Sequence, residues 1–177
     1  MWVDDVLGFW FDELEPSDWF KKNEQLDARI RDRFGSLHEA LESQAIAVPD
    51  TPQGYLAAII VLDQFSRNLH RGSPKAFACD DRALALAQLA IERGYDRALT
   101  EIQRKFVYMP FMHSEDRDMQ AKCVELFSAI GDAEALRYAI EHRDIVARFG
   151  RFPHRNSILG RDPTPEEAEF MKHHAGF

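Results

Sequence analysis

Apolar residues recur along most of the chain at steps of three and four, the period of a helix that buries one face. From Gln25 to Leu41 the apolar positions keep this step, while the positions between them are charged. No segment shows a convincing alternation of apolar and polar residues, so the chain predicts an all-α fold. The expected helices cover residues 3–11, 25–41, 52–69, 80–91, 100–109, 115–130, 133–148 and a short stretch from 165.

Caps and breakers add detail to this pattern. Residues 55–62 are apolar nearly all round, which places that helix at the centre of the core. We expect Pro110 to end the helix before it and Ser114 to cap the next one. Gly131 and Asp132 end one helix and cap another, which predicts an antiparallel helical hairpin. The fold class is therefore a helical bundle of antiparallel hairpins.

Length and composition favour one soluble domain over residues 1–177. An apolar fraction of 45% is enough for a sizeable core. The net charge of −8 and a pI near 5.3 argue against nucleic acid or an anionic membrane as a partner. The acidic first residues argue against a secretory signal, and the isolated Cys79 and Cys123 read as buried thiols of a reducing compartment. The expected location is the cytoplasm.

Residues 142–161 invert the charge of the chain, since they hold five arginines against one acid, Asp144. Guanidinium groups bind carboxylate or phosphate through two parallel hydrogen bonds, so the segment predicts an anion site. Alternatively, the arginines pair with acids of the first fifty residues and form a structural clasp. The expected ligand-binding residues are Arg148, Arg151, Arg155 and Asn156, with His154 as a candidate to exchange protons.

A second candidate follows the most apolar helix, where Asp63 and Arg67 lie one turn apart. Asp63 shares a helical face with Leu56 and Ile59, so its carboxylate should be at least partly buried. Two interpretations stay open. The pair stiffens the bundle, or Asp63 serves as a base and Arg67 as a ligand-binding residue.

Two histidines complete the candidate set. His113 precedes two carboxylates at a loop-to-helix junction, an arrangement able to host a general base, although helix capping also explains the acids. His142 shares an apolar face with Tyr138 and Ile145, which is typical of a hydrogen-bonded core histidine. It is kept as a ligand-binding candidate because its helix leads to Arg148. No metal-binding spacing is present, so no metal ligand is expected.

Four stretches carry a resemblance that covers essentially the whole chain: VLGFWF, LDQFSRNLHRG, FVYMPFMHSED and RFGRFPHRNSILGRDPTPEE. Together they resemble the bacterial family known as domain of unknown function 924. The resemblance implies an all-α fold with a TPR-like arrangement, although no 34-residue repeat is evident. Ser66 stands where the family has proline, and Leu69-His70 where an isoleucine-aromatic pair is usual. The resemblance implies no activity.

Two functions follow from these residues. The first is a cytosolic protein that binds a small anionic metabolite in a cleft lined by residues 148–156, with catalysis left open. The second is a TPR-like interaction module whose arginine-rich loop docks an acidic peptide or acts as a clasp. RNA binding is disfavoured by the overall charge. The sequence leaves any cofactor, the reaction and the oligomeric state open.

Overall fold

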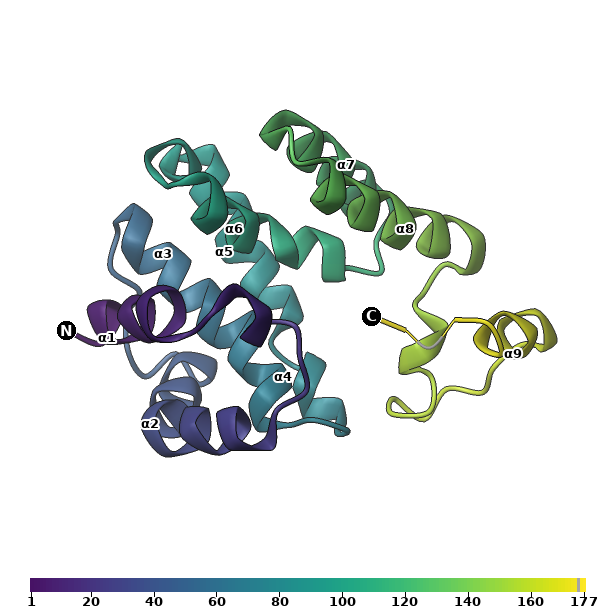
Figure 1. Ribbon diagram of the computed structural model, residues 1–177, viewed down its shortest axis with the longest axis horizontal. Helices are drawn as coiled ribbons and strands as arrows, with labels where there is room; N and C mark the ends of the chain where they lie inside the picture. Colours follow the sequence, from purple (N-terminus) through teal and green to yellow (C-terminus); the bar gives the residue numbers. More distant parts are fainter. Residues whose placement is uncertain (175) are drawn as a thin grey trace. The chain divides into compact units, whose positions relative to one another are not determined.

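The computed structural model describes residues 1–174 and 176–177, and these residues form helices and loops without a strand (Figure 1). The predicted all-α class is confirmed. No helix in this described part is long and apolar enough to cross a membrane. The elements are α1 (Trp2–Gly8), η1 (Phe9–Glu13), η2 (Pro16–Asp18), α2 (Glu24–Glu42), α3 (Pro52–Ile59), η3 (Ile60–Phe65), α4 (Ser66–Leu69), η4 (Pro74–Phe77), α5 (Asp80–Glu92), η5 (Tyr95–Ala98), α6 (Glu101–His113), α7 (Arg117–Ile130), α8 (Ala133–Phe149), η6 (Pro153–Arg155) and α9 (Pro165–Met171).

The chain divides into two compact units. Unit 1 contains Met1–Arg71 and Lys75–Pro110, and unit 2 contains Gly72–Pro74 and Phe111–Phe177. The sequence-based expectation of one domain over residues 1–177 stays a prediction.

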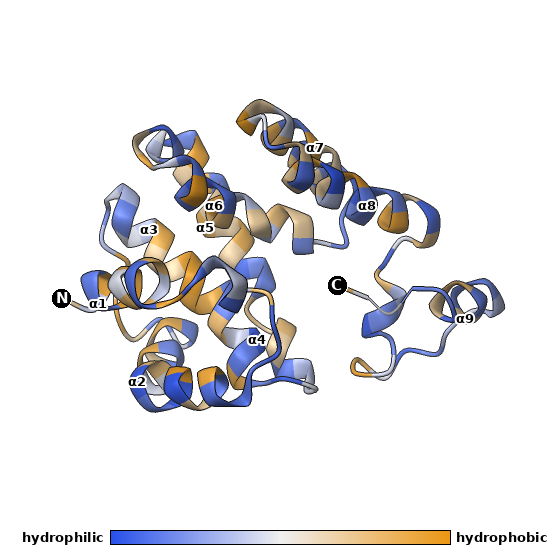
Figure 2. Cartoon of the chain, in the orientation of Figure 1, coloured by the Kyte–Doolittle hydropathy of each residue, from blue (hydrophilic) through white to orange (hydrophobic). Residues whose placement is uncertain are grey.

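The core of unit 1 forms around α3 and η3. All residues from Gly54 to Phe65 are buried, and α3 packs against α1 and α5 while η3 packs against α2, α4 and α5. Figure 2 shows α3 as a largely apolar helix. The expectation that residues 55–62 lie at the centre of a core is confirmed. A helix that is apolar on all sides is most stable when every side is shielded from water.

Two segments of unit 1, η1 and η3, are π-helical, which means that the helix widens locally. Such segments are rare in proteins but are often found at functional sites. Here η1 and η3 meet through aromatic rings, with the Trp10 and Phe65 centroids 5.5 Å apart and the Phe9 and Phe65 centroids 6.1 Å apart. The sequence period did not distinguish these segments from ordinary α-helix. Asp63 lies in η3, so this widened turn carries one of the candidate residues.

Unit 2 begins with a helical hairpin, as predicted. Helices α7 and α8 run antiparallel and pack against each other (Figure 1). Gly131 ends α7 with φ of +84°, a left-handed conformation that glycine adopts without strain. Asp132 then caps α8, because its side chain accepts hydrogen bonds from the backbone amides of Glu134 and Ala135.

The prediction that Pro110 ends its helix is wrong, because α6 continues through Pro110 to His113. Proline removes one backbone donor but does not force a helix to stop when other groups compensate. Phe111 and Met112, directly after it, are buried. The buried side chain of Gln120 donates to the carbonyl of Met112 at 2.8 Å, which satisfies part of the helix end.

The assignment of Ser114 as the N-cap of α7 is also wrong. Asp116 is the N-cap, and its carboxylate accepts from the amides of Asp118 and Met119. Ser114 Oγ instead accepts from the amide of Asp116 at 3.1 Å. Either side chain can cap a helix, and the start of α7 at Arg117 decides between them.

Candidate functional site

In unit 1, Asp63 and Arg67 form the predicted internal contact, with Arg67 Nη1 3.3 Å from Asp63 Oδ1 and 2.7 Å from its main-chain oxygen. Arg67 also forms a two-point pair with Asp80 at 3.0 and 3.1 Å, and Gln64 donates to Asp63 Oδ2 at 2.6 Å. Burial opposes the charge of Arg67, but Asp63 and Asp80 raise its pKa and keep it charged. Asp63 is therefore built into a buried network, and its role as a base stays a prediction.

Arg71 forms a second ion pair in unit 1. Its guanidinium holds the carboxylate of Asp27 at 2.8 and 2.9 Å, and Asn68 donates to the same carboxylate at 2.8 Å. Burial alone would raise the pKa of Asp27, but the hydrogen bonds from Arg71 and Asn68 lower it. The sequence did not reveal Asp27 as a partner because it lies far away along the chain.

A buried cluster of unit 1 that the sequence did not reveal joins His38, Ser66 and Cys79. His38 Nε2 lies 2.7 Å from Ser66 Oγ, and Cys79 Sγ lies 4.0 Å from His38 Nε2. The hydroxyl of Ser66 donates to the carbonyl of Leu62 at 2.6 Å, so it accepts from His38 rather than giving up its proton. Burial raises the pKa of Cys79. Neither Ser66 nor Cys79 is arranged as an activated nucleophile.

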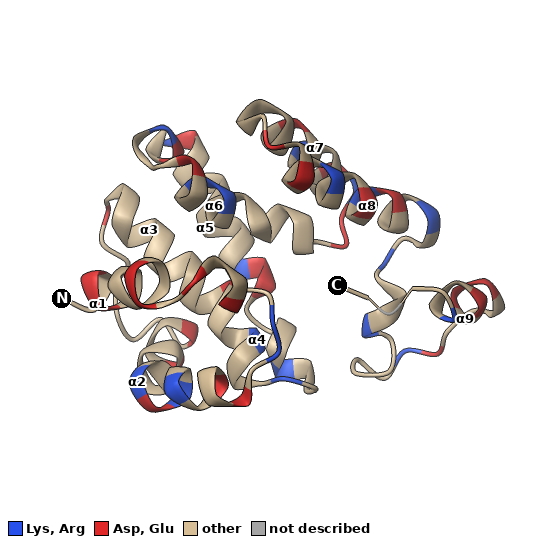
Figure 3. Cartoon of the chain, viewed as in Figure 1, with Lys and Arg blue, Asp and Glu red and all other residues tan. Residues whose placement is uncertain are grey.

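In unit 2, Arg151 is held by Glu167, the residue that closes the capping box of α9. Its Nε and Nη2 lie 2.7 and 2.8 Å from the two carboxylate oxygens, and Nη2 also donates to the carbonyl of Asp162. Glu167 further accepts from the amide of Thr164 and from Asn156 Nδ2. The hydrogen bonds of Arg151 are the main cause that lowers the pKa of Glu167 to about 2. Figure 3 shows the basic loop after α8 and the acidic start of α9.

A second arginine, Arg161, forms a two-point pair with Glu115 at 2.7 and 2.9 Å. Arg161 Nε donates to Asn156 Oδ1, and the amide of Phe152 donates to Glu115 at 2.8 Å. Glu115 was expected only as an acid near a helix start, and its partner lies 46 residues away. One continuous hydrogen-bonded network, called the arginine network below, thus joins Glu115, Arg151, Asn156, Arg161 and Glu167.

Arg155 contacts His113 through the main-chain carbonyl group of His113. Arg155 Nη2 donates to the carbonyl oxygen of His113 at 2.9 Å, and the guanidinium lies 4.7 Å from the centre of the Phe152 ring. Arg155 is 7% exposed and His113 is half-buried. This contact fixes the loop against the end of α6, and the function of either side chain stays a prediction.

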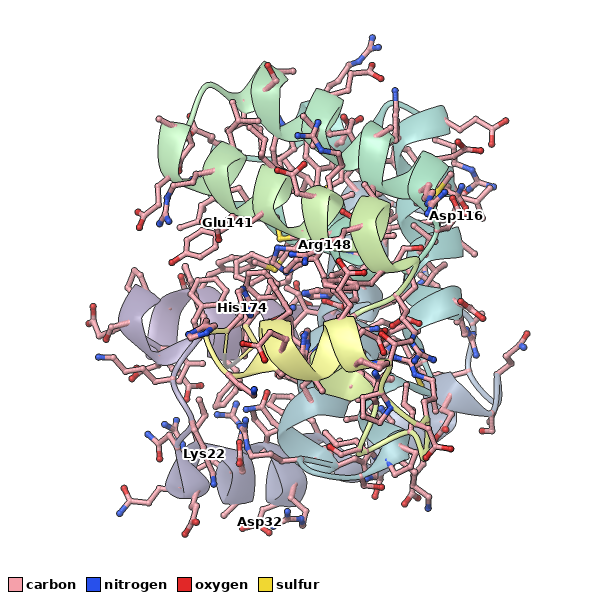
Figure 4. All side chains as sticks on the ribbon, turned by 90° about the vertical axis from the view of Figure 1, so that its right-hand side faces the viewer. Lys22, Asp32, Asp116, Glu141, Arg148 and His174 are labelled. Atoms are coloured by element: carbon pink, nitrogen blue, oxygen red, sulfur yellow. The ribbon has the colours of Figure 1, made fainter. Side chains whose placement is uncertain are left out.

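Arg148 lies at the exposed end of α8, where Figure 4 labels it. It pairs with Glu166 at 2.8 Å, and both side chains are more than half exposed. Its guanidinium also lies 4.7 Å from the Phe149 ring and 5.7 Å from the Phe170 ring. An ion pair this exposed contributes little to stability and exchanges readily.

His142 and His154 both pack against Phe152, with ring centroids 5.6 Å from it. Burial is the main cause that lowers the pKa of His142 to about 3 and that of His154 to about 4, and the charge of Arg155 contributes to both shifts. His142 Nδ1 lies 2.7 Å from the carbonyl of Tyr138, so this nitrogen carries the proton. The expectation of a hydrogen-bonded core histidine is confirmed for His142.

The predicted site residues thus fall into two groups. Asp63 and Arg67 belong to unit 1, and the others belong to unit 2. Within unit 2, Arg151 and Asn156 meet on Glu167, and Arg155 meets the main chain of His113. Among the residues that the structure describes, no group of three or more His, Cys, Asp or Glu side chains could hold a metal ion.

A shallow groove on unit 2 includes residues that the sequence analysis did not single out. Its volume is about 160 Å³, and α7 and α8 line it with Arg117, Gln120, Ala121, Arg143 and Ala147. Arg117 Nη2 donates to the carbonyl of Ala147 at 3.1 Å, and Arg143 pairs with the exposed Asp144 next to it. The predicted hairpin already places the start of α7 beside the end of α8, which was the signal that could have revealed this groove.

Comparisons with known proteins agree with this fold. A family model described as bacterial protein of unknown function (DUF924) matches residues 6–175. A solved structure from Agrobacterium tumefaciens, the protein of unknown function ATU0120, is 39% identical, with 97% of each chain covered and a TM-score of 0.91. No curated protein matches the chain. The chain therefore belongs to the bacterial DUF924 family.

Proposed function

We propose that this protein is a helical interaction module that binds an acidic segment of a protein partner in the groove between α7 and α8. The observation that carries the proposal is the pair of arginines, Arg117 and Arg143, on the walls of one groove. Two guanidinium groups carried by residues that line one shallow hollow suit a carboxylate, which accepts several charge-assisted hydrogen bonds at once.

The size of the groove favours a side chain over a metabolite. A pocket that encloses a small-molecule ligand measures about 300–1,000 Å³. The groove measures about 160 Å³, which suits a single carboxylate carried on a longer partner. Arg143 is also available at low cost, because its pair with the exposed neighbour Asp144 contributes little free energy.

The arginine network weighs against the other candidate, a small anionic metabolite on residues 148–156. An incoming anion at Arg151 would compete with both oxygens of Glu167, which is 2% exposed. Displacing that carboxylate would leave a buried charge without its partner. The TPR-like arrangement implied by the family resemblance belongs to the same proposal, since stacked helical hairpins present concave surfaces to peptides.

The proposal is tested with fluorescently labelled glutamate-rich and aspartate-rich peptides, and with lysine-rich peptides as the ligand control. We expect the acidic peptides to bind, and Arg117→Ala or Arg143→Ala to weaken binding about tenfold each, the effect of one hydrogen bond to a charged group. The matched control is Arg137→Ala, which removes an exposed arginine of α8 that pairs with Glu141 and does not line the groove.

Two results would contradict the proposal. The first is acidic-peptide binding that is equal in wild type, Arg117→Ala and Arg143→Ala. The second is a thermal shift with a phosphorylated or carboxylated metabolite that Arg151→Ala abolishes while the variant still folds. The second result would restore the metabolite site on residues 148–156.

A further inference from the structure

The side chain of Phe177 lies on a ring site of unit 2 that the proposed function does not use. Its ring stacks on the imidazole of His142, with centroids 3.6 Å apart and planes 19° from parallel. His142 is 5% exposed, whereas Phe177 is 51% exposed. The imidazole of His142 thus covers the ring of Phe177, while about half of the Phe177 residue stays exposed.

Three further rings complete the walls of this site. The rings of His154 and His174 form T-shaped pairs with Phe177 at centroid distances of 5.9 and 5.1 Å, with interplanar angles of 79° and 71°. Phe152 supports the other rings, since it packs edge-on against His142 and lies at a tilt to His154. The stack of Phe177 on His142 is nearly face to face, and the steep angles of His154 and His174 to it are of the kind that aromatic rings prefer. Figure 4 labels His174 in the segment that follows α9.

The imidazole under Phe177 presents an uncharged face. His142 Nδ1 donates to the carbonyl of Tyr138, and burial keeps the ring neutral near pH 7 because its pKa falls to about 3. A neutral ring stacks on an aromatic side chain without the cost of burying a charge. The neutral face of His142 therefore suits a planar aromatic group.

The backbone at Gly176 also packs closely against this site. Gly176 has a φ of +95°, and a Cβ there would lie 3.0 Å from Cβ and Cγ of His154. Both the conformation and the close approach require glycine at this position. The structure thus accommodates a polypeptide segment together with its aromatic side chain.

We propose that the ring site formed by His142, Phe152, His154 and His174 binds an aromatic side chain of a partner polypeptide, and that Phe177 is the resident occupant that the partner displaces. Phe177 shows which group the site accepts, and a residue that is half exposed is displaced at a lower cost than a fully buried one. The site is distinct from the groove between α7 and α8, so the two proposals succeed or fail separately.

The test uses a labelled peptide with the sequence of residues 171–177 as the probe, added to the wild-type protein and to Phe177→Ala. Since Phe177 occupies the site in the wild type, we expect Phe177→Ala to bind the probe at least tenfold more tightly. A probe with alanine in place of its phenylalanine should not bind, and probes with tyrosine or tryptophan there should bind. In the Phe177→Ala protein, His142→Leu should weaken probe binding about tenfold, the size of a lost aromatic pair.

The matched control is Tyr138→Ala, which removes an exposed aromatic side chain of α8 one turn from His142 and keeps the backbone carbonyl. It should leave probe binding unchanged. The proposal is overturned if wild type and Phe177→Ala bind the probe equally, if neither binds it, or if the alanine probe binds as tightly. Should His142→Leu fail to fold by circular dichroism, the probe series decides alone, because it leaves the protein unaltered.

Discussion

Glu167 is the residue on which the loop after α8 depends most. It is 2% exposed, and its carboxylate receives Arg151, Asn156 and the amide of Thr164. Since Arg151 and the amide of Thr164 outweigh the effect of burial, the pKa of Glu167 falls to about 2. The hydrogen bonds from Arg151 and Thr164 therefore favour the charged form of the Glu167 carboxylate.

Glu167→Gln should destabilise the protein by about 1–3 kcal/mol, because an amide cannot accept from all of these donors and carries no charge. The measurement is urea unfolding at pH 7. Glu169→Gln is the matched control on the same helix, since Glu169 forms an exposed pair with Lys172 and should change stability by less than about 0.5 kcal/mol. Equal effects of the two substitutions would show that the arginine network does not stabilise the loop.

His142 of α8 and His154 of the following loop make unit 2 sensitive to mild acid. Their pKa values in the folded protein are about 3 and about 4, whereas an unfolded histidine titrates near 6.5. Between these values the unfolded chain binds protons that the folded chain does not bind. These two histidines therefore leave the free energy of unfolding at its full value above about pH 6.5, and they lower it as the pH decreases.

Between pH 7 and pH 5 each of these histidines should lower the free energy of unfolding by about 1–2 kcal/mol. His154→Phe should reduce the drop by that amount, as measured by urea unfolding at both pH values. His173→Phe, which removes an exposed histidine, should leave the drop unchanged. The carboxylates with lowered pKa values lose their contribution only below about pH 4.3, so they do not obscure this window. If His154→Phe leaves the decrease in the free energy of unfolding unchanged, the lowered pKa of His154 is contradicted.

At the end of α6, the side chain of Gln120 replaces the donors that a continuing helix would supply. Its Nε2 donates to the carbonyls of Met112 and Ser114 at 2.8 and 2.7 Å. Gln120→Met keeps the volume and removes the donor, so it should cost about 1–3 kcal/mol in urea unfolding. Lys122→Met serves as the control, at a partly exposed position of α7 where the side chain pairs with the exposed Glu125. No loss of stability in Gln120→Met would mean that water caps these carbonyls equally well.

At the scale of the whole molecule, the sequence predicted what is local and missed what is distant. Helix period and the glycine turn at Gly131 depend on neighbours within a few residues, and both are confirmed. The partners of Arg71 and Arg161 lie more than forty residues away, and helical periodicity carries no record of such pairings. The same limit explains why the arginine-rich segment predicted an anion site while its own acids, Glu115 and Glu167, remained unidentified.

Whether the two units unfold together is the remaining question at this scale. Unit 2 is the smaller one, and a helical hairpin with a short loop and one terminal helix buries little apolar surface alone. We therefore expect one cooperative transition in thermal unfolding, with Asp27→Asn in unit 1 and Glu167→Gln in unit 2 both lowering its midpoint. Two transitions, each shifted by only one of these substitutions, would contradict the prediction of a single domain over residues 1–177. Calorimetry distinguishes the cases, because a single transition requires equal calorimetric and van't Hoff enthalpies.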